Sequence, residues 1–244
     1  MSERGSAAGR RLETRITGRV VAAIGLAVSS PLLLVCALAV KSSSPGTVIF
    51  KAPRVGKDGR TFTIWKLRTM EASTTTGATR ITGGRDARVF PVGRLLRKLK
   101  LDELPQVVNI IRGDMAIVGP RPEDPTIVEE HYTPVMRETL DVLPGLTSPG
   151  SLDYYARETS MPDDPAKAEA AYFEDLLPRK IALDLVYVRN RSWVYDLELV
   201  ARTALAMLGL PGLYSGREAW ELTHASAILC KVMPEWSPGD KVDE

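Results

Sequence analysis

The longest apolar stretch of the chain runs from Val20 to Val40 and contains no charged residue. As a straight helix rising about 1.5 Å per residue, it would just cross the roughly 30 Å hydrocarbon layer of a bilayer. Ser29, Ser30 and Pro31 lie in its middle, and a proline inside a helix removes one backbone hydrogen bond. The pattern predicts membrane association through a helix that breaks at Ser30 and Pro31, with serine hydroxyls bonding the freed carbonyls.

Positive charge flanks this stretch on both sides. The basic residues around it are Arg10, Arg11, Arg15, Arg19, Lys41, Lys51, Arg54 and Lys57. A simple span should collect its basic residues on the cytoplasmic side only. A re-entrant helix, which enters one leaflet and returns both ends to the cytoplasm, resolves this conflict. Two alternatives stay open at this point. One is a kinked single span, which composition alone favours, and the other is a signal peptide cleaved near Ala37–Ala39, although the apolar stretch is longer than the usual signal core.

Beyond a linker at Ser42–Gly46, the pattern of apolar and polar residues predicts a β-hairpin. The strand-like runs VIFKAPRV and TFTIWKLRTM enclose the turn-rich segment Gly56–Gly59. Strand alternation then puts Lys66 and Arg68 side by side on one face. The ordinary interpretation of such a pair is a solvated strand edge, where lysine also discourages edge-to-edge pairing.

Helical periodicity follows a Thr- and Gly-rich segment, 71–88, that we expect to be a loop. From Val92 onward an apolar stripe and a basic face alternate at helical spacing: Leu95, Leu96 and Leu99 against Arg94, Arg97 and Lys98. A second helix is predicted from Pro105 to Gly113, followed by a short buried run at Met115–Val118. A late apolar stripe, Leu197–Leu208, is expected either to pack on the core or to lie in the membrane interface.

These elements predict an α/β (α+β) fold. We expect a re-entrant membrane helix–break–helix followed by a compact cytosolic domain with a small β-hairpin or sheet and interfacial amphipathic helices. The predicted organisation is a basic N-terminus and membrane helix in residues 1–45, a folded domain in 46–210 and a C-terminal tail in 211–244.

Composition narrows the function classes. The 244-residue chain has a formal net charge of +2, which is too near zero to predict binding to nucleic acid. Cys36 and Cys230 form no C-x-x-C pair, and with only His131 and His224 a zinc site is not expected. The low cysteine count favours a reducing compartment.

Two adjacent acids, Asp102 and Glu103, lie in the stretch LRKLKLDELPQ directly after three basic residues and before a predicted helix. Acids at a helix start usually serve helix-end electrostatics, because the exposed amide hydrogens and the dipole favour negative charge. On spacing alone this ordinary explanation is the favoured one.

A turn downstream carries Arg121 between Pro120 and Pro122. The prolines fix the backbone around a guanidinium whose fork suits phosphate oxygens, although an arginine between prolines is also found in ordinary turns. The sequence lacks the GxxxxGK, GxGxxG, nucleophile-elbow and HExxH motifs. The carboxylates and cations that remain favour phosphoryl chemistry over acyl transfer.

The motifs K-x-R-T-M, L-D-E-L-P-Q, G-D-M and G-P-R-P, in this order, resemble the bacterial sugar transferases. These are monotopic phosphoglycosyl transferases that load a sugar phosphate onto polyprenyl phosphate. The resemblance covers roughly residues 15–210, starts at the Ser30–Pro31 break and corresponds to the small form with a single anchor.

The resemblance implies that Asp102 attacks the β-phosphorus of a UDP-sugar, expels UMP and carries the phosphosugar until polyprenyl (undecaprenyl) phosphate accepts it. It implies Mg²⁺ near Glu103 and Asp102. The phosphate- or nucleotide-binding residues that it suggests are Lys66, Arg68, Arg97, Pro120, Arg121 and Pro122. It also favours the re-entrant helix, surrounded by membrane lipid, and places the catalytic domain at the cytoplasmic face of the bacterial inner membrane. The product would begin the assembly of an exopolysaccharide, capsule, O-antigen or glycoprotein glycan.

The chain departs from the family after its Pro-Gly-Leu-Thr motif. Where many members have Gly-Trp-x-Gln and an Asn-Gly-Arg-like segment, this chain has SPGSLDYYARE, and Arg157 is the nearest candidate for the late arginine. The sugar therefore stays open. A non-catalytic membrane-anchored scaffold and a bitopic protein whose domain faces outward are the alternatives, and the sequence does not decide between a monomer and a homodimer.

Overall fold

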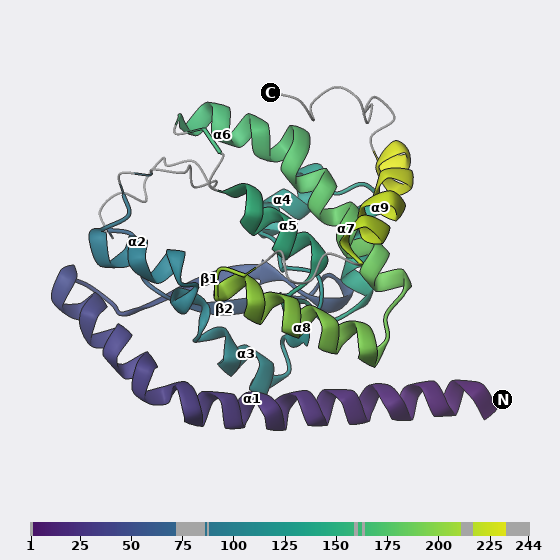
Figure 1. Ribbon diagram of the computed structural model, residues 1–244, viewed down its shortest axis with the longest axis horizontal. Coiled ribbons are helices and arrows are strands. Elements are labelled where there is room, and N and C mark those ends of the chain that lie inside the picture. The colour runs from purple at the N-terminus through teal and green to yellow at the C-terminus, as the bar shows by residue number, and fades with distance from the viewer. Residues whose placement is uncertain are drawn as a thin grey trace.

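A long helix, α1 (Ser2–Ser43), forms one edge of the protein in the computed structural model (Figure 1). The structure describes residues 2–71, 86, 88–158, 161–162, 164–210 and 217–232. Within α1, Ile16–Ser43 is long and apolar enough to cross a membrane. Only 11% of its most apolar 18-residue segment is buried against the rest of the protein. Because so little of this apolar surface packs on protein, it favours a lipid environment.

Pro31 lies inside α1, and the helix continues through it to Ser43. Figure 1 shows α1 curving, with its N-terminal part along the lower edge and its C-terminal end turned up toward the domain. Ser30 Oγ donates at 2.8 Å to the carbonyl of Ala27, the group that Pro31 leaves without its usual amide donor. The role predicted for the serine hydroxyls is confirmed. The predicted helix–break–helix is not shown, because curvature and this hydrogen bond accommodate the proline within one continuous helix.

The predicted hairpin is confirmed: β1 (Ile49–Val55) and β2 (Thr61–Leu67) pair antiparallel. A short 3-10 turn, η1 (Lys57–Gly59), joins the strands, and Asp58 has a left-handed φ of 58° there. Aspartate tolerates this conformation better than most residues with a side chain. β2 ends at Leu67, so the strand alternation that would put Lys66 and Arg68 side by side stops before it reaches Arg68.

Both helices predicted around the acidic pair are confirmed. They are α2 (Pro91–Lys98) and α3 (Gln106–Arg112), with the 3-10 turn η3 (Leu101–Glu103) between them. α3 packs against α1 and β2. Its buried Asn109 accepts from the Trp65 amide at 3.2 Å and donates to the Thr63 carbonyl at 2.7 Å, which fixes α3 on the hairpin. α3 ends at Gly113, whose φ of 87° is the left-handed conformation common at helix C-termini.

A second pair of strands, β3 (Ala116–Val118) and β4 (Gly145–Thr147), is parallel. The chain between them forms α4 (Pro125–His131) and η4 (Met136–Asp141). Gly119 N donates to Thr147 O, and Gly145 N donates to Pro120 O, both at 2.9 Å. The two backbones approach so closely that a Cβ on Gly145 would overlap the backbone of Gly119. This contact holds the chain that leads into Arg121.

Gly145→Ala is expected to lower the free energy of unfolding by about 1–3 kcal/mol, because the added methyl group must displace the Gly119 backbone. Thermal unfolding of the detergent-solubilised protein measures the change. Gly18→Ala is the matched control, since a Cβ at Gly18 meets no atom within 4 Å. Equal melting temperatures for the two variants would contradict the close approach.

Helices make up the rest of the described chain: α5 (Pro149–Glu158), α6 (Pro165–Ala171), the π-helical turn η5 (Tyr172–Leu176), α7 (Leu177–Arg189), α8 (Trp193–Met207) and α9 (Glu218–Val232). α7 lies at the centre of the main core, where Ile181 and Leu185 pack with Ala225 and Leu229 of α9. Part of the predicted tail is therefore a core helix. Its apolar residues recur at helical spacing, a pattern that the polar residues around them obscure in the sequence.

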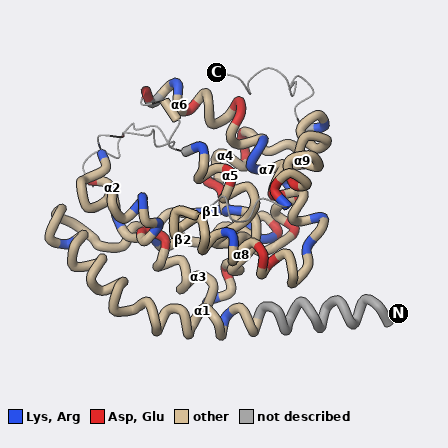
Figure 2. The backbone as a smooth tube through the Cα atoms, viewed as in Figure 1, with Lys and Arg blue, Asp and Glu red and all other residues tan. Residues whose placement is uncertain are grey.

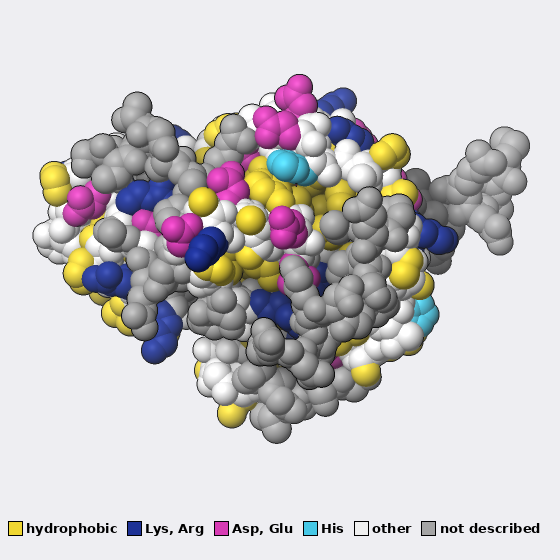
Figure 3. Space-filling view, turned by 90° about the horizontal axis from the view of Figure 1, so that it is seen from above, with side chains coloured by type: hydrophobic (Ala, Val, Ile, Leu, Met, Phe, Trp, Pro, Cys, Tyr) yellow, Lys and Arg dark blue, Asp and Glu magenta, His cyan; other side chains and the backbone are white. Residues whose placement is uncertain are grey.

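α8 has one face in the core and one apolar face outside it. Tyr195 and Leu199 are fully buried, whereas Trp193 and Leu197 are 72% and 60% exposed. Figure 2 shows few charged residues along the described part of α1, with charges of both signs on the elements above it. Figure 3, the view from above, shows Lys, Arg, Asp and Glu side chains on that face. The protein thus has an apolar edge along α1, and the described residues on the face away from it include charged side chains of both signs among apolar ones.

Candidate active site

The acidic pair lies in η3, one turn ahead of α3. Lys100 turns the chain with a left-handed φ of 53°, and the amides of Glu103 and Leu104 then donate to carbonyls three residues back, each at 3.3 Å. Asp102 and Glu103 are only 7% and 8% exposed. The prediction of acids at a helix start therefore becomes a pair of buried acids in a 3-10 turn. Buried carboxylates require compensating partners, which ordinary helix-end acids in water do not.

Glu103 receives those partners from three other elements. Lys66 Nζ on β2 donates to Oε1 at 3.1 Å, and Arg121 donates to both oxygens, through Nη1 to Oε2 at 3.0 Å and through Nη2 to Oε1. Tyr155 on α5 donates its hydroxyl to Oε2 at 3.4 Å. Burial alone would raise the pKa of Glu103, but the charges of Arg121 and Lys66 outweigh burial and hold this pKa well below its usual range. Glu103 is a permanent anion that anchors two cations.

Asp102 differs from its neighbour. No group in the described part of the chain donates a hydrogen bond to its carboxylate. Burial and the adjacent charge of Glu103 raise the pKa of Asp102, and Lys66, Arg97 and Lys100 oppose this rise. A carboxylate with raised basicity, held among cations and without hydrogen-bond donors, is suited to nucleophilic attack.

Asp184 of α7 accepts a hydrogen bond from the backbone of Arg121. Asp184 is 2% exposed, and its carboxylate accepts from the Gly150 amide at 3.0 Å at the start of α5. On the other side of the loop, the Val55 amide at the end of β1 donates to the Glu123 carbonyl at 2.9 Å. The loop that carries Arg121 is therefore held by contacts with the β4 strand, with the end of β1 and with α7.

Asp184 is expected to make the protein less stable as the pH rises. Burial raises the pKa of Asp184 from 3.8 to about 6, with the charge of Lys180 in opposition. The folded state therefore binds this proton more tightly than the unfolded state, and ionisation costs stability as the pH rises through 6. Between pH 5 and pH 8 the wild type should lose about 1.4 kcal/mol of unfolding free energy relative to Asp184→Asn. Thermal unfolding at both pH values measures this, and parallel pH profiles would contradict it.

Two residues of this site were not predicted from the sequence: Tyr155, and Lys100 as a site residue. Tyr155 accepts from Arg121 Nη1 at 2.6 Å, and its ring lies 3.7 Å from Lys100 Nζ. Tyr155 is separated from Glu103 by 52 positions. No local pattern in SLDYYARE marks it. The left-handed backbone of Lys100 gives no sequence signal either, because lysine is not a residue favoured in that conformation.

The other predicted cations are placed differently. Arg97 Nε donates to Thr69 Oγ1 at 2.9 Å, close enough to Asp102 to act on its pKa. Arg68 is buried and donates to Thr47 O, Ser44 O and Ser44 Oγ at 2.6–2.8 Å, where it fastens the chain after α1 to the end of β2. Arg157 forms an ion pair with Asp153 on its own helix at 3.4 Å. The structure therefore brings Lys66, Arg97 and Arg121 to the acids and gives Arg68 and Arg157 other contacts.

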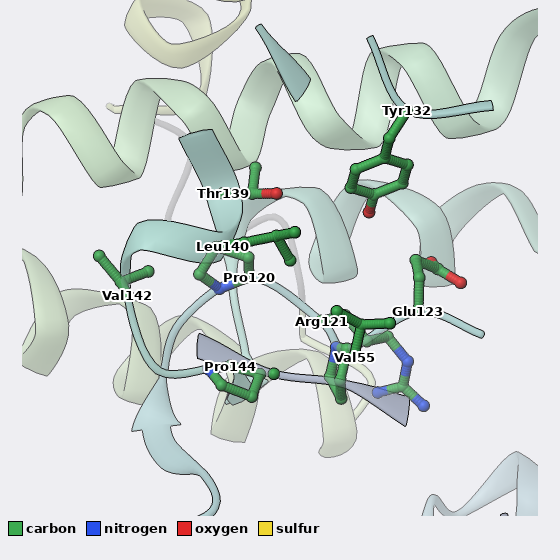
Figure 4. A pocket seen from close by; sticks show the side chains of 11 residues that line it. Val55, Pro120, Arg121, Glu123, Tyr132, Thr139, Leu140, Val142 and Pro144 are labelled. Carbon is green, nitrogen blue, oxygen red and sulfur yellow. The ribbon is translucent and has the colours of Figure 1, made fainter. Parts of the chain in front are cut away.

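A small cavity lies beside the loop that carries Arg121, and Arg121 and Glu123 are among the residues that line it (Figure 4). Its lining is mainly apolar and includes Val55, Pro120, Leu140, Val142 and Pro144. Neither acid of η3 lines it. Arg121, which bonds Glu103, is the residue that the cavity and the acidic cluster share.

The residues around the acidic pair only partly fit the predicted magnesium site. In the parts of the chain that the structure describes, no three His, Cys, Asp or Glu side chains gather closely enough to hold a metal ion. Each Glu103 oxygen already accepts two hydrogen bonds, so Glu103 as placed does not fit as a ligand. Mg²⁺ is usually held by one or two carboxylates and substrate phosphates, which Asp102 fits.

A buried pair of carboxylates, a surrounding set of cations and an exposed apolar helix together indicate a membrane-associated enzyme of phosphoryl transfer. Residues 9–209 match the family described as bacterial sugar transferase, and the chain belongs to this family of transferases.

Relatives of known activity support this assignment. The chain is 35% identical over 206 residues to a UDP-glucose:undecaprenyl-phosphate glucose-1-phosphate transferase of Caulobacter vibrioides, covering 83% of this chain and 72% of that protein. A protein of the same description from Escherichia coli is 36% identical over 195 residues, covering 79% and 39%. A UDP-N-acetylgalactosamine-undecaprenyl-phosphate N-acetylgalactosaminephosphotransferase of Aeromonas hydrophila is 34% identical over 192 residues, covering 78% and 42%. The chain thus spans less than half the length of the last two relatives, which differ in the sugar named.

Proposed function

We propose that this protein transfers a sugar 1-phosphate from a UDP-sugar to polyprenyl phosphate and releases UMP. The names of the relatives support this donor and acceptor class. The observation that carries the proposal is the contrast within the acidic pair. Glu103 is fully ion-paired, whereas Asp102 is buried beside it and accepts no hydrogen bond from the described residues. The Glu103 carboxylate holds the cations in place, and the Asp102 carboxylate is available to attack the donor.

Each half of the reaction exchanges one bond at phosphorus. An Asp102 oxygen attacks the β-phosphorus, the bond from that phosphorus to the bridging oxygen breaks, and UMP leaves with the electron pair. The sugar phosphate remains on the carboxylate. An oxygen of polyprenyl phosphate then attacks the same phosphorus, and cleavage of its bond to Asp102 restores the carboxylate.

Both steps bring an anion toward an anionic phosphorus, so repulsion must be reduced by fixed positive charge. Lys66 and Arg121 are held beside Asp102 by their bonds to Glu103, and Arg97 is held by Thr69. Because these cations are positioned before substrate arrives, little reorganisation is required during the reaction. Mg²⁺, when bound by Asp102 and the donor diphosphate, would supply further charge neutralisation.

The membrane arrangement is part of the proposal. We place α1 as a re-entrant helix with both ends at the cytoplasmic face of the bacterial inner membrane, because basic residues flank it on both sides. The exposed apolar side chains Trp193 and Leu197 of α8, Leu95 of α2 and Leu99 directly after α2 would lie in the same interface. With the protein held at the membrane interface, a soluble nucleotide-sugar and a lipid phosphate can both reach the Asp102 carboxylate.

Cysteine accessibility tests the arrangement. In a variant without Cys36 and Cys230, single cysteines placed before Arg19 and after Lys41 should both react from the cytoplasmic side of membrane vesicles. Labelling on opposite sides would reject the re-entrant helix in favour of a single span.

A UMP-release screen tests the activity. Detergent-solubilised protein is incubated with Mg²⁺, polyprenyl phosphate and each member of a panel of UDP-sugars. Release of UMP with one or more donors, together with a sugar-diphosphate lipid product, is the expected result and also names the sugar. No release with any donor would favour a non-catalytic membrane scaffold that keeps the fold.

A further inference from the structure

A buried ion pair lies beside the loop that carries Arg121, and the proposed reaction gives it no role. Lys180 Nζ on α7 donates to Oε1 of Glu123, two positions after Arg121 in the chain. The Tyr172 hydroxyl donates to the same oxygen at 3.0 Å. The side chains of Lys180 and Glu123 are only 5% and 11% exposed. A second buried carboxylate with its own cation therefore lies next to the cations of the acidic pair.

Stability alone does not account for this pair. The cost of removing both charges from water offsets most of their attraction, so a buried ion pair contributes little net stability compared with apolar side chains of similar size. α7 is already anchored in the main core by Ile181 and Leu185, which are fully buried. The Lys180–Glu123 pair therefore points to a role in determining which charged groups meet.

Arg121 is attracted by two buried carboxylates. It bonds both oxygens of Glu103, and Figure 4 shows its guanidinium and the Glu123 carboxylate leaving the loop in different directions. Burial alone would lower the pKa of Arg121, but the negative charges around it, that of Glu103 first and that of Glu123 among them, raise this pKa. Because a guanidinium fork can bond both oxygens of only one carboxylate at a time, the two glutamates compete for it.

Lys180 decides this competition in favour of Glu103. Arg54 also acts on Glu123, but the Arg54 guanidinium is paired with Asp124 at 3.2 Å. If Lys180 were neutral, Glu123 would be a buried anion without its bonded cation, which is costly. Arg121, two positions away in the same loop, would then be drawn toward Glu123.

α7 holds the same loop at a second point. Asp184, one helical turn after Lys180, accepts a hydrogen bond from the backbone of Arg121. Two oppositely charged residues of α7 thus contact the backbone of Arg121 and the side chain of Glu123. The backbone contact sets where Arg121 starts, and the contact with Glu123 affects where its guanidinium goes.

We propose that Lys180 is a positioning residue for the transfer reaction: by satisfying the charge of Glu123, it leaves the Arg121 guanidinium to bond Glu103 beside Asp102. This inference rests on the proposed function and deepens it. Lys180 acts on the reaction through Glu123 and Arg121 and does not itself touch the substrate.

The two single variants of the pair separate a positioning role from a structural one. Lys180→Met leaves Glu123 buried and charged, so Arg121 should turn toward it and kcat for UMP release should fall about tenfold. Glu123→Gln breaks the same ion pair but leaves no competing charge, so kcat should stay within about threefold of the wild-type value. A pair that served only to hold the fold together would give equal losses of kcat in the two variants, and that result would overturn the proposal.

The double variant supplies the rescue. Lys180→Met with Glu123→Gln removes both charges and should bring kcat back to within about threefold of the wild type. Arg189→Met is the matched control, because it breaks an exposed ion pair of the same helix, with Glu138 at 2.9 Å, and should change kcat less than about twofold. If Lys180→Met does not fold, Lys180→Gln takes its place, since its amide keeps a donor near Glu123 without the charge. A double variant as slow as the single lysine variant would contradict the role given to Lys180.

Structures of the variants need no turnover, so they distinguish failure of this inference from failure of the proposed function. In Lys180→Met, Arg121 should bond Glu123, and in the double variant it should bond Glu103 as in the wild type. If both are seen but no UDP-sugar yields UMP, the proposed reaction fails and the positioning role of Lys180 stands. If UMP is released and Arg121 stays on Glu103 in Lys180→Met, the reaction stands and the positioning role is wrong.

Discussion

Asp102→Asn is expected to reduce UMP release by about a thousandfold or more, because an amide cannot form the bond to phosphorus that the carboxylate forms. The substitution preserves shape and removes one charge. Since the Asp102 carboxylate is buried beside Glu103 and accepts no hydrogen bond from the described residues, its removal should not destabilise the fold. The melting temperature of the variant should therefore equal or exceed that of the wild type, which separates loss of chemistry from loss of structure.

The same variant tests the intermediate. When polyprenyl phosphate is omitted, the wild type should release about one UMP per protein molecule, and its mass should increase by one sugar phosphate. Asp102→Asn should show neither effect. UMP release that persists in the variant, or a burst without a mass increase, would rule out Asp102 as the nucleophile and leave direct transfer between the two substrates.

Local patterns were sufficient to predict the elements that frame the site. The hairpin follows from two β-rich runs around Gly56–Gly59, and α2 and α3 follow from apolar spacing and from Pro105 and Gly113. In each case neighbouring residues determine the structure. Strand alternation predicted that Lys66 and Arg68 share one face, with a solvated strand edge as the ordinary interpretation. This prediction failed for Arg68, because the strand ends at Leu67 and the following residue turns toward Ser44 and Thr47.

The parts of the site that could not be predicted depend on distant contacts. Glu103 meets Tyr155 across 52 positions, and Gly150 meets Asp184 across 34. Spacing therefore could not show that the acidic pair is buried, which is the property that separates a reactive pair from ordinary helix-end acids. The exposure of Asp102 and Glu103 is set by elements that arrive later in the chain, namely the Arg121 loop and α5.

Arg121→Met is expected to cause a large loss of both stability and activity. Arg121 bonds both oxygens of Glu103 and the Tyr155 hydroxyl, and its removal leaves Lys66 as the remaining cation bonded to a buried carboxylate. Breaking a buried pair from one side costs about 3–5 kcal/mol, because the uncompensated charge stays behind. UMP release should also fall, since the positive charge beside Asp102 is reduced. Thermal unfolding and UMP release measure the two effects independently.

A second substitution separates these effects. Arg121→Met with Glu103→Gln removes both charges, so it should regain most of the lost stability but little of the activity. The stability deficit of Arg121→Met should also shrink as the pH falls. Removal of Arg121 takes away the largest opposing charge that lowers the pKa of Glu103, so Glu103 is protonated at a higher pH than in the wild type, and protonation removes the buried charge. Arg121→Lys keeps the charge but not the two-pronged contact and should be intermediate. If Arg121→Met were as stable as the wild type at neutral pH, Glu103 could not be the buried anion that holds the cations of this site in place.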